Sequence, residues 1–323
     1  MLFITNRKLK QAPTKRLRSG RRIDFDLKIN TPENNVYFCR KTGPDQYEEV
    51  TSKPFLRELR ESPIEQILLY IHGFSNLPDQ VFSRTEKLQK LFDQKKKNQV
   101  LVIPMIWPCD NDFGIVLDYW DDQKAADNSA FAFSRALQLF LKWRTGTDDE
   151  GKPCRKRINV VAHSMGNRVL RETLKMWNKY DLANGVPLLF RNTFMVAADI
   201  VNESLHRGHS GEFISHASRN VCVYYASDDL ALRASKASNL KNKISSRRLG
   251  HSGPEDINRV SKNVYSVDCD DINMKYDPLT GHSYFAEAPD GKPGKLFEHM
   301  HASMMSGRIE KLSGIDLRQQ MIA

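Results

Sequence analysis

The chain has 323 residues, and 40% of them are hydrophobic, which is ample for a large buried core. The mean hydropathy is −0.54, and no apolar run approaches the ~20 residues that cross a bilayer, so we expect no transmembrane segment. Basic residues follow a short apolar start at residues 1–7, the reverse of the order in a signal peptide. We therefore expect a cytoplasmic protein.

The net charge of +10 is concentrated in two segments. Residues 1–22 carry eight Lys or Arg and no acid, and residues 230–254 carry six and no acid, which leaves +10 − 14 = −4 for the rest. These segments either are solvated or bind an anionic partner, a peripheral contact with a membrane surface included. Neither interleaves its basic residues with the aromatic ones that stack on bases, so we expect no nucleic-acid partner.

The five cysteines are scattered along the chain and form no C-x-x-C pair. An odd number at irregular spacing supports neither a disulfide framework nor a zinc site. We expect no metal and no cofactor.

The pattern of the N-terminal part predicts a loosely attached basic arm at residues 1–22, ahead of a single domain at residues 23–323. Residues 23–29 alternate between apolar and polar and predict a half-buried strand. Residues 36–39 predict a second strand, and the turn between the two predicts an antiparallel hairpin.

Two continuous apolar runs follow, at residues 67–71 and 100–107. Such runs are typical of strands buried on both faces of a parallel sheet. Pro104 in the second run indicates a bulge or an edge strand, because proline lacks the N–H that a neighbouring strand needs.

Residues 158–177 form the central motif of the chain. An apolar run leads into a turn of small residues around Ser164, and apolar residues at helical spacing follow. Strand, sharp turn and helix, with a serine at the apex, is the geometry of a nucleophile elbow. Gly166 lets the helix begin close to the strand. Ala162 replaces the first glycine of the usual G-x-S-x-G with the smallest available change.

Three later apolar runs are followed by residues with acidic or basic side chains, which are candidates for catalysis. They are residues 194–198, ahead of Asp199; residues 221–226, ahead of Asp228 and Asp229; and residues 264–267, ahead of the loop that holds His282. Strands that alternate with helices predict an α/β fold with a doubly wound, mostly parallel sheet. Since the carboxyl ends of parallel strands share one edge, we expect Ser164, an aspartate and His282 to meet there.

We predict that His282 is the general base, because it lies in the loop after the last strand and next to Gly281. His299 and His301 are the alternatives. Both fall within a predicted helix, where an imidazole is less free to reach across the sheet.

The acid that orients the base is predicted to be Asp229, with its neighbour Asp228 as the alternative. Only one of the two can point at the imidazole, and the other would cap the helix that begins at Leu230. Asp199, which ends the preceding strand, is a third candidate.

Backbone N–H groups should stabilise the oxyanion. We predict that Met165, directly after the nucleophile, and Phe74 supply them. Gly73 permits the bend that aims the N–H of Phe74 inward, and His72 is expected to hold that loop by hydrogen bonding. A further segment, residues 231–260, is predicted to be an exposed basic lid or loop insertion near the mouth of the site.

Five motifs occur in order, at residues 69–74, 162–170, 225–232, 248–250 and 281–285. Together they resemble the α/β-hydrolase superfamily and, more closely, a bacterial family of α/β-hydrolases of unknown function, over about residues 23–310. The resemblance implies the α/β-hydrolase fold and a Ser-Asp-His triad. In the family's pattern the second aspartate of the strand-end pair is retained, which supports Asp229, and alanine occurs at the position of Ala162. The resemblance implies no particular substrate.

These expectations describe a serine hydrolase, of the carboxylesterase or lipase kind, that cleaves an ester, thioester or related acyl bond of a small molecule. The alternative is a non-catalytic α/β-hydrolase scaffold that binds an anionic partner through its basic segments. The complete set of serine, aspartate and histidine favours the enzyme. Nothing in the sequence indicates an oligomeric state.

Overall fold

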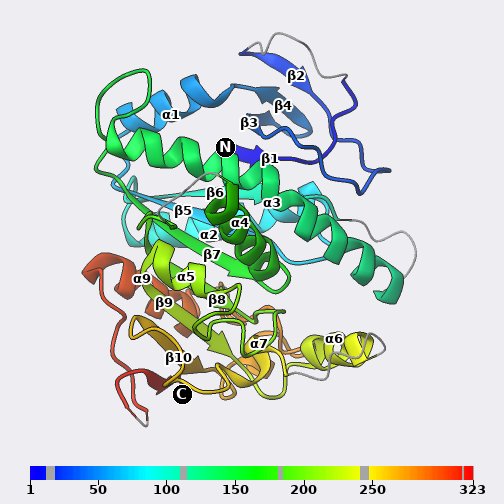
Figure 1. Ribbon diagram of the computed structural model, residues 1–323, viewed down its shortest axis with the longest axis vertical. Helices are drawn as coiled ribbons and strands as arrows, with labels where there is room; N and C mark the ends of the chain where they lie inside the picture. Colours follow the sequence, from blue (N-terminus) through cyan, green and yellow to red (C-terminus); the bar gives the residue numbers. More distant parts are fainter. Residues whose placement is uncertain (12–18, 110–114, 181–184, 241–246, 315, 323) are drawn as a thin grey trace.

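The computed structural model describes residues 1–11, 19–109, 115–180, 185–240, 247–314 and 316–322. In this part of the chain the strands are β1 (Leu2–Thr5), β2 (Arg21–Ile23), β3 (Tyr37–Gly43), β4 (Gln46–Glu49), β5 (Gln66–Ile71), β6 (Val100–Ile106), β7 (Arg157–His163), β8 (Phe190–Val196), β9 (Ser218–Tyr225), β10 (Val264–Asp268) and β11 (Gln319–Met321). They form one sheet in the order β11-β10-β9-β8-β7-β5-β6-β1-β3-β4-β2 (Figure 1).

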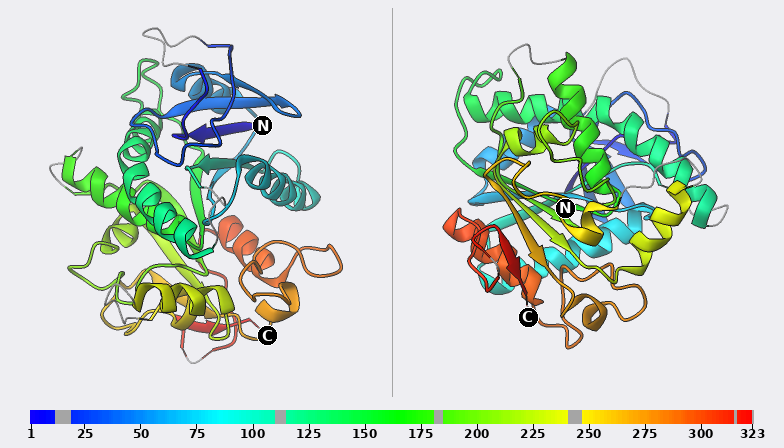
Figure 2. Two further views of the ribbon diagram at one scale, coloured as in Figure 1. Left: turned by 90° about the vertical axis from the view of Figure 1, so that its right-hand side faces the viewer. Right: turned by 60° about the horizontal axis from the view of Figure 1, so that its bottom comes forward.

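The helices of the described residues cover both faces of this sheet. They are α1 (Ser52–Glu61), α2 (Pro78–Lys95), α3 (Ile115–Thr145), α4 (Gly166–Tyr180), α5 (Glu212–Ala217), α6 (Leu230–Leu240), α7 (Leu249–Ser252), α8 (Asn273–Tyr276) and α9 (Lys295–Ser306). One hydrophobic core lies under α1, α3 and α4, and a second lies under α2 and α9. The left view of Figure 2 shows α3 and α4 on one side of the sheet and α2 and α9 on the other.

Strands β5 to β10 run parallel to their neighbours, and β1 joins them in parallel beside β6. The remaining N-terminal pairs, β1–β3, β3–β4 and β4–β2, are antiparallel. The predicted fold class, a doubly wound and mostly parallel sheet with an antiparallel N-terminal part, is confirmed. Its parallel strands bring their carboxyl ends to one edge, and the candidate site forms there.

The hairpin itself differs from the predicted one. It joins β3 to β4 through a two-residue loop, Pro44-Asp45, and Asp45 has a φ of 50°. The earlier strand, β2, pairs with β4 and does not contact β3 as a partner strand. The Gly-Pro-Asp turn signal between β3 and β4 decided the pairing, because a tight turn sets which strands become neighbours.

The predicted N-terminal arm is wrong for the first residues. They form β1, which lies inside the sheet between β6 and β3, with the side chains of Phe3 and Ile4 fully buried. Arg7, which is also buried, donates from Nη1 to the carbonyl oxygen of Cys109 at 2.6 Å. Residues 12–18 of the arm lie outside the described residues. The apolar run at the start has only four strand residues, and basic residues follow it. A pattern this short does not distinguish a central strand from a tail.

Pro104 had suggested that β6 could be an edge strand. It is not one, because β6 lies between β5 and β1. Pro104 pairs in register with Tyr70 of β5 on one side. On the other side β1 pairs with β6 only at Met105 and Ile106, after the proline.

Replacing Phe3 with alanine is expected to lower the free energy of unfolding by about 3–5 kcal/mol, because it empties a buried aromatic cluster. The ring centroid of Phe3 lies 5.1 Å from that of Phe82 and 6.0 Å from those of Phe25 and Tyr47. Urea denaturation measures the change. The control is Lys10→Ala at an exposed position, with an expected effect within about 0.5 kcal/mol. Equal small effects would mean that the segment is a loose arm after all.

None of the helices in the described ranges is long and apolar enough to cross a bilayer. The five cysteines are buried and free.

Candidate active site

Ser164 lies at the turn between β7 and α4, with a φ of 53°. This left-handed conformation is strained for a residue with a Cβ. The side-chain amide of Asn167 holds the turn by donating to the carbonyl oxygens of Ala162 at 2.9 Å and Ser164 at 3.1 Å. A Cβ on Gly166 would lie 2.4 Å from the carbonyl oxygen of Ile71. Only glycine therefore lets α4 begin so close to β5.

His282 is joined to Asp229. The Nδ1 atom of His282 lies 2.7 Å from Oδ2 of Asp229, whose side chain is fully buried. Oδ1 of the same carboxylate accepts a hydrogen bond from the backbone N–H of Leu232 at 2.9 Å, in the first turn of α6. One aspartate thus both holds the imidazole and caps the helix.

The prediction that the other aspartate of the pair caps this helix is wrong. The carboxylate of Asp228 instead accepts a hydrogen bond from the side-chain amide of Asn273, at the start of α8. The adjacent side chains point in different directions, because the chain turns from β9 into α6 at this place.

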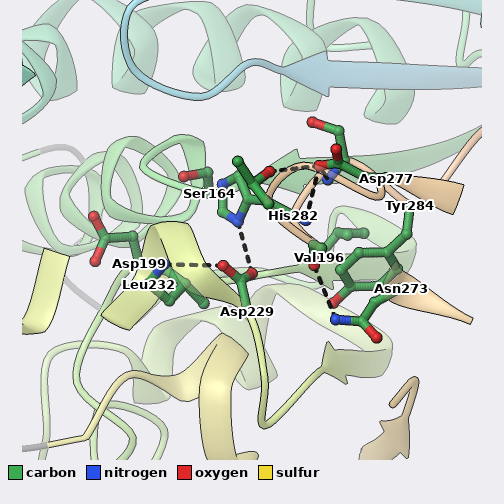
Figure 3. Close-up of polar contacts among 12 residues, drawn as sticks. Ser164, Val196, Asp199, Asp229, Leu232, Asn273, Asp277, His282 and Tyr284 are labelled. Carbon is green, nitrogen blue, oxygen red and sulfur yellow. Dashed lines mark hydrogen bonds and ion pairs between the residues drawn. The ribbon is translucent and has the colours of Figure 1, made fainter. Parts of the chain in front are cut away.

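Ser164 and His282 line the same cavity of 530 Å³. Figure 3 shows the imidazole between Ser164 and Asp229, with the serine at the end of the ring away from the carboxylate. The structure thus brings together three residues that are separated by up to 118 positions, counted from 164 to 282. A hydroxyl, an imidazole and a carboxylate in this order can carry out acyl transfer.

Asp277, which no sequence motif had singled out, holds the loop of His282. Its Oδ2 accepts the backbone N–H groups of His282 and Ser283, each at 2.9 Å, and the hydroxyl of Thr280 at 2.6 Å. Burial alone would raise the pKa of this carboxyl, but these hydrogen bonds outweigh it and hold the pKa below its usual value. The signal in the sequence was Asp277-Pro278, typical of a side chain that hydrogen-bonds its own turn.

His163 supports the same loop from β7. Its Nε2 lies 3.1 Å from the carbonyl oxygen of His282, and its ring packs against that of Phe285. Burial, followed by the nearby His282, lowers the pKa of His163 well below its usual value, so the ring is neutral and Nε2–H is the donor.

The two alternative histidines lie elsewhere. His299 is engaged at both ring nitrogens, with the hydroxyl of Tyr224 at 2.7 Å and the carbonyl oxygen of Glu310 at 2.9 Å. The ring of His301 packs beside those of Phe92 and Phe297. Both belong to α9, which covers the face of the sheet over β8 and β9, and neither lines the cavity.

Asp199 lines the cavity but has other partners. Its Oδ2 accepts from the hydroxyl of Tyr119 at 2.8 Å, and its Oδ1 accepts from Ser235 at 2.6 Å. The guanidinium of Arg248 lies 3.2 Å from the same Oδ1. The Asp199 carboxylate thus links α3, α6 and the residue before α7. The hydrogen-bond partner of the His282 ring is Asp229 instead.

The loop after β5 carries the other predicted oxyanion donor. Within the described residues, neither Phe74 N–H nor Met165 N–H donates to an acceptor of the protein. The side chain of Asn76 donates to the carbonyl oxygens of Gly73 and Phe74. The loop is therefore held in place while both N–H groups remain available.

His72 holds this loop by hydrogen bonds, as predicted. Its Nδ1 lies 2.8 Å from the carbonyl oxygen of Gly73, and its Nε2 accepts the backbone N–H of Trp107 at 3.2 Å. Burial lowers the pKa of His72 to about 3, so the imidazole is neutral, with the proton on Nδ1. The ring also stacks on the indole of Trp107.

The segment at residues 231–260 is only partly the predicted lid. The first turns of α6 line the cavity with Ala231, Leu232 and Ala234. In the later part, Leu249 and Gly250 are buried, and they bond to the backbone of residues 198 and 200 beside β8. Leu249 is apolar and Gly250 allows a close backbone contact, so this part is buried although the residues around it are basic. Residues 241–246 lie outside the described residues.

Residues 48–296 match the protein family described as alpha/beta hydrolase of unknown function (DUF900). The chain belongs to this family. The sequence resemblance and the predicted fold are thereby both confirmed. No curated protein matches the chain. A solved structure, that of a lipase-esterase related protein from Clostridium acetobutylicum ATCC 824, shares 12% identity with the chain and has a TM-score of 0.25, over 58% of this chain and 84% of that one.

Proposed function

We propose that this α/β hydrolase is a serine hydrolase of the carboxylesterase or lipase kind, with Ser164 as nucleophile, His282 as general base and Asp229 as the orienting acid. The observation that carries the proposal is the buried Asp229–His282 hydrogen bond beside Ser164 at the edge of one cavity. The strained φ of Ser164 supports it, because an elbow presents the hydroxyl to the cavity.

In this mechanism Nε2 of His282 takes the proton of Ser164 as Oγ attacks the acyl carbon. Asp229 keeps the imidazole proton on Nδ1 and stabilises the imidazolium that forms. The N–H groups of Phe74 and Met165 stabilise the oxyanion. His282 then protonates the leaving alcohol or thiol, and the same base activates the water that hydrolyses the acyl-enzyme.

The lining of the cavity disfavours an anionic acyl group. Phe74, Leu230 and Leu232 supply apolar surface, while no Lys or Arg is among the described lining residues. A volume of 530 Å³ falls within the range of about 300–1,000 Å³ that small-molecule sites occupy. A small-molecule ester or thioester fits these properties better than an acidic substrate.

The test is covalent labelling of the purified protein by a fluorophosphonate, together with hydrolysis of p-nitrophenyl butyrate in the presence of EDTA. We expect one adduct, located by peptide mass spectrometry on Ser164, and turnover that EDTA leaves unchanged. Absence of both labelling and turnover over a series of acyl chains would favour the non-catalytic scaffold.

A further inference from the structure

Four arginines gather at the edge of the sheet opposite Ser164. Arg157, Arg191 and Arg219 are the first or second residues of β7, β8 and β9, and Arg144 lies in the last turn of α3. In Figure 1 the arrows of β7 and β9 point toward α6, so these strands start at the far edge. We call these four residues the arginine cluster.

The arginine cluster has no acidic partner among the described residues. Within the described residues, none of the four makes an ion pair, although their guanidinium groups can donate up to five hydrogen bonds each. Arg144 donates to the carbonyl oxygen of Lys156 at 3.0 Å. Nε of Arg191 is buried and has no hydrogen-bond partner.

The four charges act on one another. Burial, followed by the charges of Arg157, Arg219 and Arg144, lowers the pKa of Arg191. The guanidinium of Arg191 packs against Gly307 at the C-terminal end of α9, where the helix dipole offers only a partial negative charge. Like charges held together without a counter-ion destabilise a fold, so an external anion would relieve this repulsion.

A groove continues the arginine cluster at Arg157. It has a volume of 520 Å³, and its charged lining comprises Arg60, Glu65, Arg155, Lys156 and Arg157. Arg60 pairs with Asp148 and Glu150, and Glu65 pairs with Lys96. The charges left uncompensated are therefore positive. None of the described residues that line the groove is aromatic, so they offer no ring on which a base could stack.

We propose that the arginine cluster and the adjoining groove bind a ligand that carries more than one phosphate group. Guanidinium groups bind phosphate oxygens through paired N–H donors. Neighbouring strands lie about 4.8 Å apart, and Arg191 and Arg219 are opposite each other in register, so these two can contact adjacent phosphates. The seven residues of β7, at about 3.3 Å each, place this site about 23 Å from Ser164. It is a second site, separate from the proposed catalysis.

The test is isothermal titration of the full chain with inorganic pyrophosphate at low ionic strength, with thermal unfolding beside it. We expect binding that weakens steeply with added salt and a melting temperature that rises by about 3–5 °C at saturation. The double variant Arg191→Gln/Arg219→Gln should bind at least tenfold more weakly. Arg219→Gln alone, at an exposed position, guards against misfolding and should weaken binding in the same direction.

The matched control is Arg207→Gln/Arg259→Gln. These two arginines are exposed, and their backbones are hydrogen-bonded to each other, so the variant removes the same net charge from another surface. It should bind pyrophosphate as the unaltered chain does. Equal loss in both double variants, or no binding by the unaltered chain, would overturn the proposal.

A second arm identifies the source of the phosphate. Phosphatidylcholine vesicles, with or without phosphatidic acid, are sedimented with the chain and with the two double variants. Co-sedimentation that needs phosphatidic acid and the arginine cluster assigns the site to a lipid headgroup. Pyrophosphate binding without co-sedimentation assigns it to a soluble phosphorylated ligand.

Discussion

Replacing Ser164 with alanine is expected to abolish fluorophosphonate labelling and to lower kcat for p-nitrophenyl butyrate by about 10⁴- to 10⁶-fold. The variant keeps the cavity, His282 and the backbone donors, so the loss measures covalent catalysis alone. The residual rate is the contribution of substrate binding and oxyanion stabilisation. Substrate affinity should change little, because the serine hydroxyl contributes little to ground-state binding.

The control for this variant is Ser129→Ala. Ser129 is fully buried in α3, its hydroxyl donates to the carbonyl oxygen of Ala125 at 2.8 Å, and it does not line the cavity. Its labelling and kcat should stay within about twofold of the unaltered chain, since it loses one intrahelical hydrogen bond. If Ser164→Ala were still labelled, another residue would be the nucleophile, and Ser75 and Ser235 are the other serines among the described lining residues.

Replacing Asp229 with asparagine is expected to lower kcat by about 10³- to 10⁴-fold, and Asp228→Asn by less than about fivefold. The oxygen of the new amide can still accept the N–H of Leu232 and cap α6. Its NH₂ group, however, would face Nδ1 of His282 and favour the tautomer with the proton on Nε2. In that tautomer the base cannot take the proton of Ser164.

Steady-state kinetics of the two variants side by side, with circular dichroism for folding, checks this prediction. Asp228→Asn is the matched control, because it makes the same chemical change one residue away, at the bond to Asn273. A larger loss in Asp228→Asn would transfer the role of acid to that residue. Asp199→Asn completes the set, and we expect its effect to fall on the packing of α6 through Ser235.

Much of the proposed site follows from local pattern. The pattern around Ser164 is an apolar run, a turn of small residues and then helical spacing, and it predicts an elbow. The structure has β7, Ser164 in the left-handed backbone conformation, and α4 at that place. Parallel strands then place the residues that follow β9 and β10 at the same edge. His282 was therefore predictable as a neighbour of the elbow, since its loop follows β10.

The direction of individual side chains was not predictable in the same way. Asp228 and Asp229 are adjacent and have identical chemistry, so only the path of the backbone into α6 decides which carboxylate faces His282. Asp199 could have reached the base from its strand end. Its oxygens instead have partners from three other segments of the chain, Tyr119, Ser235 and Arg248, and no local pattern encodes that meeting.

The sequence by itself determined the fold class, the family and the elbow, because these depend on periodicity and on the order of strand ends along the chain. Only the tertiary structure decided that residues 2–5 form a strand inside the sheet and that four arginines from separate elements lie together, with no ion-pair partner in the described part of the chain. Both outcomes depend on which distant segments become neighbours. A short strand is stabilised by the partners on either side of it, and a charge is compensated only by groups near it in space.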